Sequence, residues 1–85
     1  MFDTLEYLKN AKHKVVGVKQ TQKAVQRDQT DWVVMARDAD PRVLRELQEL
    51  CQAKGIALHW VETMQELGKA AGIQVGSATA AVLKE

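Results

Sequence analysis

Residues 32–41 read Trp-Val-Val-Met-Ala-Arg-Asp-Ala-Asp-Pro, and this stretch indicates the fold class. Its first five residues are an unbroken apolar run, which predicts a buried strand. Asp40 followed by Pro41 predicts a helix start, because the carboxylate can accept from free helix N–H groups and proline suits the first helical position. A buried strand that leads into a capped helix is a building unit of α/β proteins.

The rest of the chain continues this alternation of helices and strands. Apolar residues recur at helical spacing after Pro41 at Val43, Leu44, Leu47, Leu50 and Cys51, until Gly55 predicts a left-handed helix end. Phe2, Leu5 and Leu8 form a similar apolar stripe at the start of the chain, where Asp3 begins a capping box. Thr63 begins a second capping box. The expected elements are a helix over residues 3–12, a strand over 15–18, a helix over 19–26, a strand over 32–36, a helix over 41–54, a strand over 56–61 and a helix over 63–72.

Residues 77–83 are rich in small side chains, and periodicity does not distinguish a helix from a strand there. The alternation of the preceding elements favours a final strand. Helices that alternate with strands pack on both faces of a central sheet. We therefore expect an α/β fold, a three-layer α/β/α sandwich, in one domain that spans residues 1–85.

Composition narrows the classes of function. The chain has 85 residues, of which 46% are hydrophobic and 27% charged, as in globular proteins. The single cysteine, Cys51, excludes an internal disulfide and a cysteine-based zinc site. No apolar stretch is long enough to cross a bilayer, and the N-terminus lacks the layout of a signal peptide. These features predict a cytoplasmic protein, with a monomer as the simplest state.

No residue pattern supports catalysis or a cofactor. The chain contains neither a glycine-rich nucleotide loop nor a nucleophile beside a base, so we expect no enzyme activity and no small-molecule substrate. Asp38 and Asp40 follow a strand, where catalytic groups can occur, but Asp40 already has a capping role. His13 and His59 lack the spacing of metal ligands.

Charge is distributed unevenly along the chain. Residues 1–27 carry six basic and two acidic side chains, a net charge of +4, whereas residues 28–85 carry six basic and nine acidic ones, a net charge of −3. No acidic residue occurs between Lys9 and Arg27. Such asymmetry is typical of a surface that faces a polyanion, and it also occurs on solvated helix faces.

The helix over residues 19–26 lacks the cap that the other three helices have. Its entry, Gly17-Val18-Lys19, contains no Asp, Ser or Asn, and it places a lysine where the helix dipole favours an acid. Free N–H groups at a helix start suit a phosphate, and glycine allows another backbone to approach closely. Gln20 can donate to and accept from a base edge, and Lys23 can reach a phosphate or a guanine.

These residues carry a family resemblance. Residues 17–25, Gly-Val-Lys-Gln-Thr-Gln-Lys-Ala-Val, resemble the Gly-x-Asn-Glu-x-x-Lys-Ala signature of the kink-turn-binding ribosomal protein family (archaeal L-seven-Ae type). In its small bacterial single-domain members, the Asn-Glu pair is typically Lys-Gln, as here. The resemblance continues through residues 33–41, 51–56 and 67–78, in the right order and spacing.

The resemblance implies a four-stranded mixed sheet and binding to RNA kink-turns, which are bent elements built on tandem sheared G·A pairs. By position in the family signature, Lys19 and Gln20 would contact the guanines, with Lys23 beside them, and Gly17 would permit the close approach. The loop Ile73-Gln74-Val75-Gly76 would pack on the nucleotide that is flipped outward. Lys14 and Arg37 flank this surface as candidate phosphate contacts.

The resemblance leaves the natural RNA open among ribosomal RNA, a riboswitch and another structured leader. The alternative function from another class is a protein–protein interaction module of the same fold, with the acidic part of the chain as its partner surface. The basic Lys19-Gln20-x-x-Lys23 pattern distinguishes the two, because an RNA reader needs it and a protein adaptor does not.

Overall fold

The computed structural model describes residues 3–84 and contains four helices and four strands that alternate along the chain. The elements are α1 (Thr4–Asn10), β1 (Lys14–Val16), α2 (Val18–Gln26), β2 (Thr30–Ala36), α3 (Pro41–Lys54), β3 (Ala57–Val61), α4 (Met64–Ala71) and β4 (Thr79–Leu83). The strand order in the sheet is β1-β4-β2-β3. β2 and β3 are parallel, whereas β4 is antiparallel to both of its neighbours, so the sheet is mixed.

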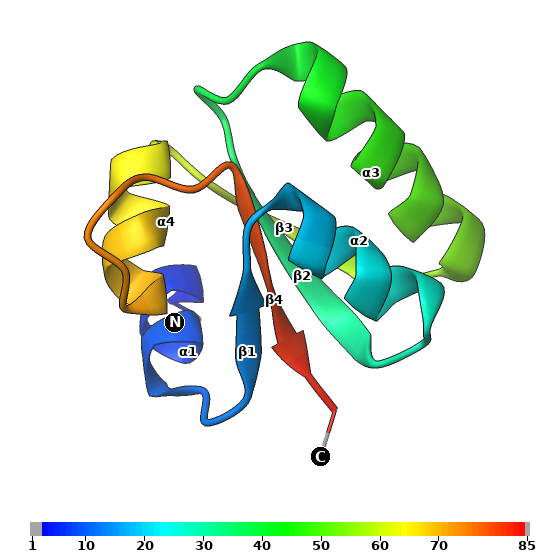
Figure 1. The fold of residues 1–85 in the computed structure, drawn as a ribbon, viewed down its shortest axis with the longest axis horizontal. Helices are drawn as coiled ribbons and strands as arrows, with labels where there is room; N and C mark the ends of the chain where they lie inside the picture. The colour runs from blue at the N-terminus through cyan, green and yellow to red at the C-terminus, as the bar shows by residue number, and fades with distance from the viewer. Residues whose placement is uncertain (1–2, 85) are drawn as a thin grey trace.

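The helices cover both faces of this sheet. Figure 1 shows α1 and α4 on one side and α2 and α3 on the other. The predicted three-layer α/β/α arrangement, the four-stranded mixed sheet and the final strand are therefore confirmed.

The core centres on the two inner strands, β2 and β4. Val33, Val34 and Met35 of β2 are fully buried, as expected for a strand whose two faces both carry helices. Ala80 and Ala81 of β4 are also fully buried. Because β4 is covered on both faces, its side chains need not alternate between apolar and polar, which explains why its sequence lacks a strand period.

Side-chain caps begin three of the helices, as the sequence predicts. Asp3 accepts from two N–H groups of α1, Asp40 accepts from the N–H of Arg42 at 2.9 Å, and Thr63 accepts from the N–H of Glu66 at 3.1 Å. α4 has an additional cap from outside its own segment, because Asp38 accepts from the N–H of Met64 at 2.8 Å. These bonds satisfy donors that a helix start otherwise leaves unpaired.

Three details differ from the expectations. Val18 begins α2 instead of ending β1, because Gly17 turns the chain with φ 100°. α1 ends at Asn10 instead of continuing to residue 12, because Ala11 is extended. Val43 is 38% exposed and lies at the margin of the apolar face of α3 rather than within it. Phe2 lies outside the described residues.

The Asp40 cap predicts a pH dependence of stability. Hydrogen bonds from the Arg42 side chain and backbone hold the pKa of Asp40 below its ordinary value of 3.8. A carboxyl whose pKa falls on folding stabilises the protein above its unfolded pKa, and this contribution is lost as pH falls through the folded pKa. Asp40→Asn should therefore unfold more easily than the wild type at neutral pH, and the gap should close below about pH 4.

Urea unfolding across this pH range measures the effect. Asp31→Asn removes an exposed carboxylate that caps no helix and serves as the control. A stability gap of the same size at pH 3 and pH 7 would contradict the role of the Asp40 charge.

Candidate functional site

Three strands end, and β4 begins, along one edge of the sheet, which we call the carboxyl edge. Backbone hydrogen bonds of 2.9 Å follow this edge from strand to strand: Gly17 N–H to Thr79 O, Ala36 N–H to Ala78 O, and Arg37 N–H to Val61 O. The start of α2, the segment that enters β4 and the loop after β2 therefore meet at one edge. The carboxyl ends of strands are where α/β folds place their binding residues.

The start of α2 is exposed at this edge, and it lacks a side-chain cap. Gly17 is its N-cap residue, with φ 100° and ψ 158°, a conformation that residues with a Cβ rarely adopt. A Cβ at Gly17 would meet nothing within 4 Å, so the requirement for glycine comes from the backbone and not from lack of space. No side chain among residues 3–84 caps this helix start. The prediction of an uncapped second helix is confirmed.

The side chains of α2 divide into two faces. Thr21, Ala24 and Val25 are buried against the sheet. Three candidate contact residues lie exposed on the other face: Lys19, Gln20 and Lys23. The first turn contains no acidic residue. Two ammonium groups beside the positive end of the helix dipole make this surface suited to an anion.

The loop between α4 and β4 lies against α4 through backbone contacts. The N–H of Ile73 bonds to Gly68 O at 3.0 Å, and the N–H of Ser77 bonds to Met64 O at 3.0 Å. A Cβ built at Gly68 would lie 2.0 Å from the carbonyl oxygen of Val75, so only glycine permits this approach. Between these anchors, Gln74, Val75 and Gly76 are exposed, and the Val75 side chain is 71% exposed.

The remaining two candidates differ in their surroundings. Arg37 lies at the carboxyl edge, where its guanidinium stands 5.4 Å from the ring centroid of Trp60 and 3.6 Å from Glu62. Lys14 lies at the opposite end of β1, and its ammonium donates to Leu8 O at 3.1 Å and to the neighbouring carbonyl of α1 at 3.2 Å. The structure therefore brings Arg37, but not Lys14, to the edge that holds α2.

Two residues at this edge have roles that the sequence reasoning missed. The sequence favours a family-typical loop position for Asp38 over a catalytic or metal-binding role, and in the structure its carboxylate caps α4. The sequence predicts a core or half-buried strand position for Trp60, and in the structure its half-buried ring contacts Arg37. No local pattern identifies either role, because each contact joins segments that are separate in the sequence.

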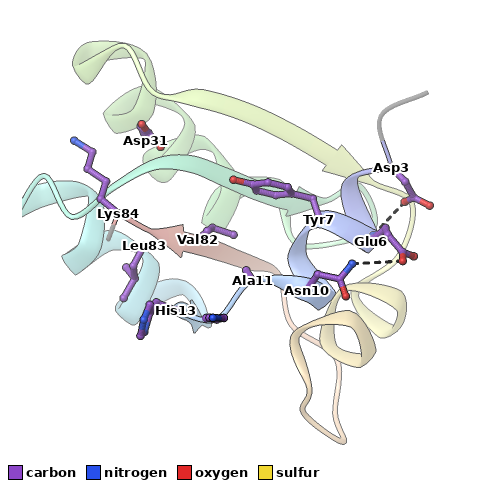
Figure 2. A pocket seen from close by; sticks show the side chains of 11 residues that line it. Asp3, Glu6, Tyr7, Asn10, Ala11, His13, Asp31, Val82, Leu83 and Lys84 are labelled. Atoms are coloured by element: carbon purple, nitrogen blue, oxygen red, sulfur yellow. Dashed lines mark hydrogen bonds between the residues drawn. The ribbon is translucent and has the colours of Figure 1, made fainter.

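One hollow lies away from the carboxyl edge. It has a volume of about 860 Å³ and is lined from α1, from the loop that follows α1, from Asp31 of β2 and from the end of β4 (Figure 2). Asp3, Glu6 and Asp31 contribute carboxylates to it, and Lys12 and Lys84 contribute ammonium groups. Among residues 3–84, no three His, Cys, Asp or Glu side chains gather as a metal site, and no helix is long and apolar enough to span a membrane.

The two histidines and the cysteine do not join the candidate site. His59 stacks on Trp32 with ring centroids 4.8 Å apart, and burial lowers the pKa of its imidazole. Cys51 is fully buried in the core, and burial raises the pKa of its thiol, which disfavours the reactive thiolate. His13 lines the large hollow.

Comparison with known proteins gives consistent matches. The family model described as the ribosomal protein L7Ae/L30e/S12e/Gadd45 family matches residues 1–85. An RNA-binding protein of Halalkalibacterium halodurans is 42% identical over 79 residues, which are 93% of this chain and 96% of that protein. The large ribosomal subunit protein eL8 of Halobacterium salinarum is 42% identical over 82 residues, which are 95% of this chain and 68% of that protein.

A solved structure shows the same fold. The 15.5 kDa RNA-binding protein of Giardia lamblia superposes with a TM-score of 0.83 at 24% sequence identity. The superposition covers 95% of this chain and 68% of that chain.

The Gly68 contact predicts the effect of one methyl group. Alanine at an exposed helix position is better than glycine by about 1 kcal/mol. Here, however, the new Cβ would collide with the Val75 carbonyl, so Gly68→Ala should lower stability by about 1–3 kcal/mol, as overpacking does. Amide exchange of Ile73 and Ser77 should accelerate, because both amides bond to α4. Unchanged exchange with increased stability would show that the loop does not depend on this contact.

Proposed function

Because the chain belongs to the ribosomal protein L7Ae/L30e/S12e/Gadd45 family, we propose that it is an RNA-binding protein that recognises kink-turns and stabilises their bent state. The relatives described above are RNA-binding and ribosomal proteins and not enzymes. The proposed function is accordingly binding without catalysis.

The start of α2 carries the proposal. An exposed helix start on Gly17, without a cap or an acidic first turn, presents Lys19 and Gln20 toward solvent. Proteins do not read the narrow major groove of regular A-form RNA, but they do read bulges and distorted grooves. A helix end with polar side chains fits the widened groove at tandem G·A pairs. The carboxamide of Gln20 can accept from a guanine N–H, and Lys19 can donate to a guanine acceptor.

Three further contacts would favour the bent form of the RNA. Lys23 lies one turn after Lys19 on the exposed face of α2 and would contact a backbone phosphate. Ile73 and Val75, in the loop anchored on α4, would give an apolar seat to the nucleotide that is flipped outward. Arg37 would add a second basic contact at the same edge.

The mechanism is a shift of population. A free kink-turn is in equilibrium with an extended form, and a protein that contacts only the bent form favours it by its differential affinity. Gly17 and Gly68 hold α2 and the loop in place before RNA binds, so little ordering is needed on association. We propose a cytoplasmic monomer as the binding species, with ribosomal RNA or a riboswitch or leader RNA as its target.

A titration with paired RNAs tests the proposal. The protein should bind a kink-turn RNA tightly at physiological salt and should lose most of that affinity when the sheared G·A pairs are replaced by Watson–Crick pairs. Equal, weak and salt-sensitive binding to both RNAs would refute kink-turn recognition. That result would favour the protein–protein interaction module instead.

The phosphate contact of Lys23 predicts a change in salt dependence. Lys23→Ala should weaken binding and flatten the plot of log affinity against log salt by about one unit, the value for one lost phosphate contact. Lys9→Ala is the matched control, because it removes the same charge from α1, on the other face of the sheet. A slope that changes equally in both variants would indicate that only net charge matters.

A further inference from the structure

A second basic feature of the carboxyl edge is a groove between β3 and the first turns of α3. Its volume is about 340 Å³. Leu44, which is 6% exposed, and the half-buried indole of Trp60 contribute its apolar surface. Arg37, Arg45 and Gln48 line its rim. None of the described residues that line the groove carries a carboxylate, although residues 28–85 as a whole are acidic.

The groove and the start of α2 lie at the same edge of the sheet. The N–H of Arg37 donates to Val61 O of β3. The N–H of Ala36 donates to Ala78 O, and the N–H of Gly17 donates to the next carbonyl along the chain, Thr79 O. Three strand spacings separate β1 from β3, a distance of roughly 14 Å. Both features also belong to the sheet face that α2 and α3 cover (Figure 1). A ligand seated on α2 can therefore continue along this edge to the groove.

The chemistry of the groove suits a nucleotide. The guanidinium of Arg37 lies over the Trp60 ring, with its central carbon 5.4 Å from the ring centroid, which is a cation–π contact. Arginine planes and aromatic rings both stack on RNA bases, and unpaired bases are available for such stacking. Arg45 offers a cation for the attached phosphate on the other side of the groove.

The larger hollow of Figure 2 is a poorer candidate for RNA. Asp3, Glu6 and Asp31 line it, and their carboxylates oppose the approach of phosphates. It also lies at α1 and at the end of β4, away from the carboxyl edge. The smaller groove has both the charge and the location that an RNA ligand requires.

We propose that this groove holds one unpaired nucleotide adjacent to the kink-turn, with its base stacked on the Arg37–Trp60 pair and its phosphate beside Arg45. The proposal rests on RNA binding at α2. It adds a second contact, separate from α2 and from the loop at residues 73–76, that would let the protein prefer kink-turns with a single-stranded flank.

The experiment compares a kink-turn duplex that has flush ends with a set of extended duplexes. Each extended duplex carries three unpaired uridines at one of its strand ends. One extension should increase the affinity of the wild-type protein about tenfold, within the range for a single base–aromatic stack. A 5-iodouridine in that extension should cross-link to Trp60 on irradiation.

Three variants locate the gain in the groove. Arg37→Lys keeps the charge but loses the planar group, Trp60→Leu removes the ring, and Arg45→Ala removes the cation. Each should reduce the tenfold gain to about twofold or less. Affinity for the flush duplex should stay within a factor of about two or three in Trp60→Leu and Arg45→Ala. Arg37 also contacts the kink-turn in the proposed function, so Arg37→Lys is judged by the ratio of its two affinities. Arg42→Ala is the matched control on α3, because its guanidinium pairs with Asp40 and does not line the groove.

The outcomes separate this proposal from the proposed function. Loss of the gain in Arg37→Lys and Arg45→Ala supports the groove, even if Trp60→Leu fails to fold by circular dichroism. No gain from any extension, or a gain that survives in Arg37→Lys and Arg45→Ala, overturns it and assigns the groove to a protein partner. Kink-turn recognition is judged separately, because replacement of the G·A pairs changes the affinity of the flush duplex.

Discussion

The pairing of β4 with both β1 and β2 is the constraint on which the rest of the structure depends. β4 begins where β1 and β2 end, so its first residues bond to Gly17 and to the end of β2. This antiparallel insertion brings the start of α2 and the loop after α4 to one edge, although more than fifty residues separate them in the sequence. Ala80 and Ala81 of this inserted strand are fully buried between the two helical layers.

The helix starts differ in how their free N–H groups are satisfied. The starts of α1, α3 and α4 are satisfied by Asp3, Asp40 and Thr63, and Asp38 adds a second bond at α4. Only α2, among the described helices, begins without a side-chain cap. In the proposed function this uncapped start contacts the RNA, in line with the tendency of local rules to be broken at functional sites. The segment from Lys9 to Arg27, which contains no acidic residue, has two roles. Lys14 donates to the end of α1, whereas Lys19 and Lys23 of α2 face solvent.

Two glycines act as positioning residues for different reasons. Gly17 supplies a backbone conformation, and Gly68 supplies space for the Val75 carbonyl. Both features hold flexible segments in a single arrangement before any ligand binds. Such preorganisation suits a protein that selects one shape of RNA, because the bent form then meets a complete surface and the extended form does not.

The sequence by itself determined the α/β class, the order and type of the elements from α1 to α4, three caps, the uncapped α2 and the family, because these depend on local patterns and short motifs. The tertiary structure alone decided the role of Asp38, the engagement of Lys14, the exposure of Val43 and the Arg37–Trp60 groove. Each of these depends on packing or on a contact between separate elements; Asp38 and Met64 are 26 residues apart. The alternation of the preceding elements favours a strand at residues 77–83, but its place between β1 and β2 belongs to this second group, since its buried alanines lack a periodic pattern.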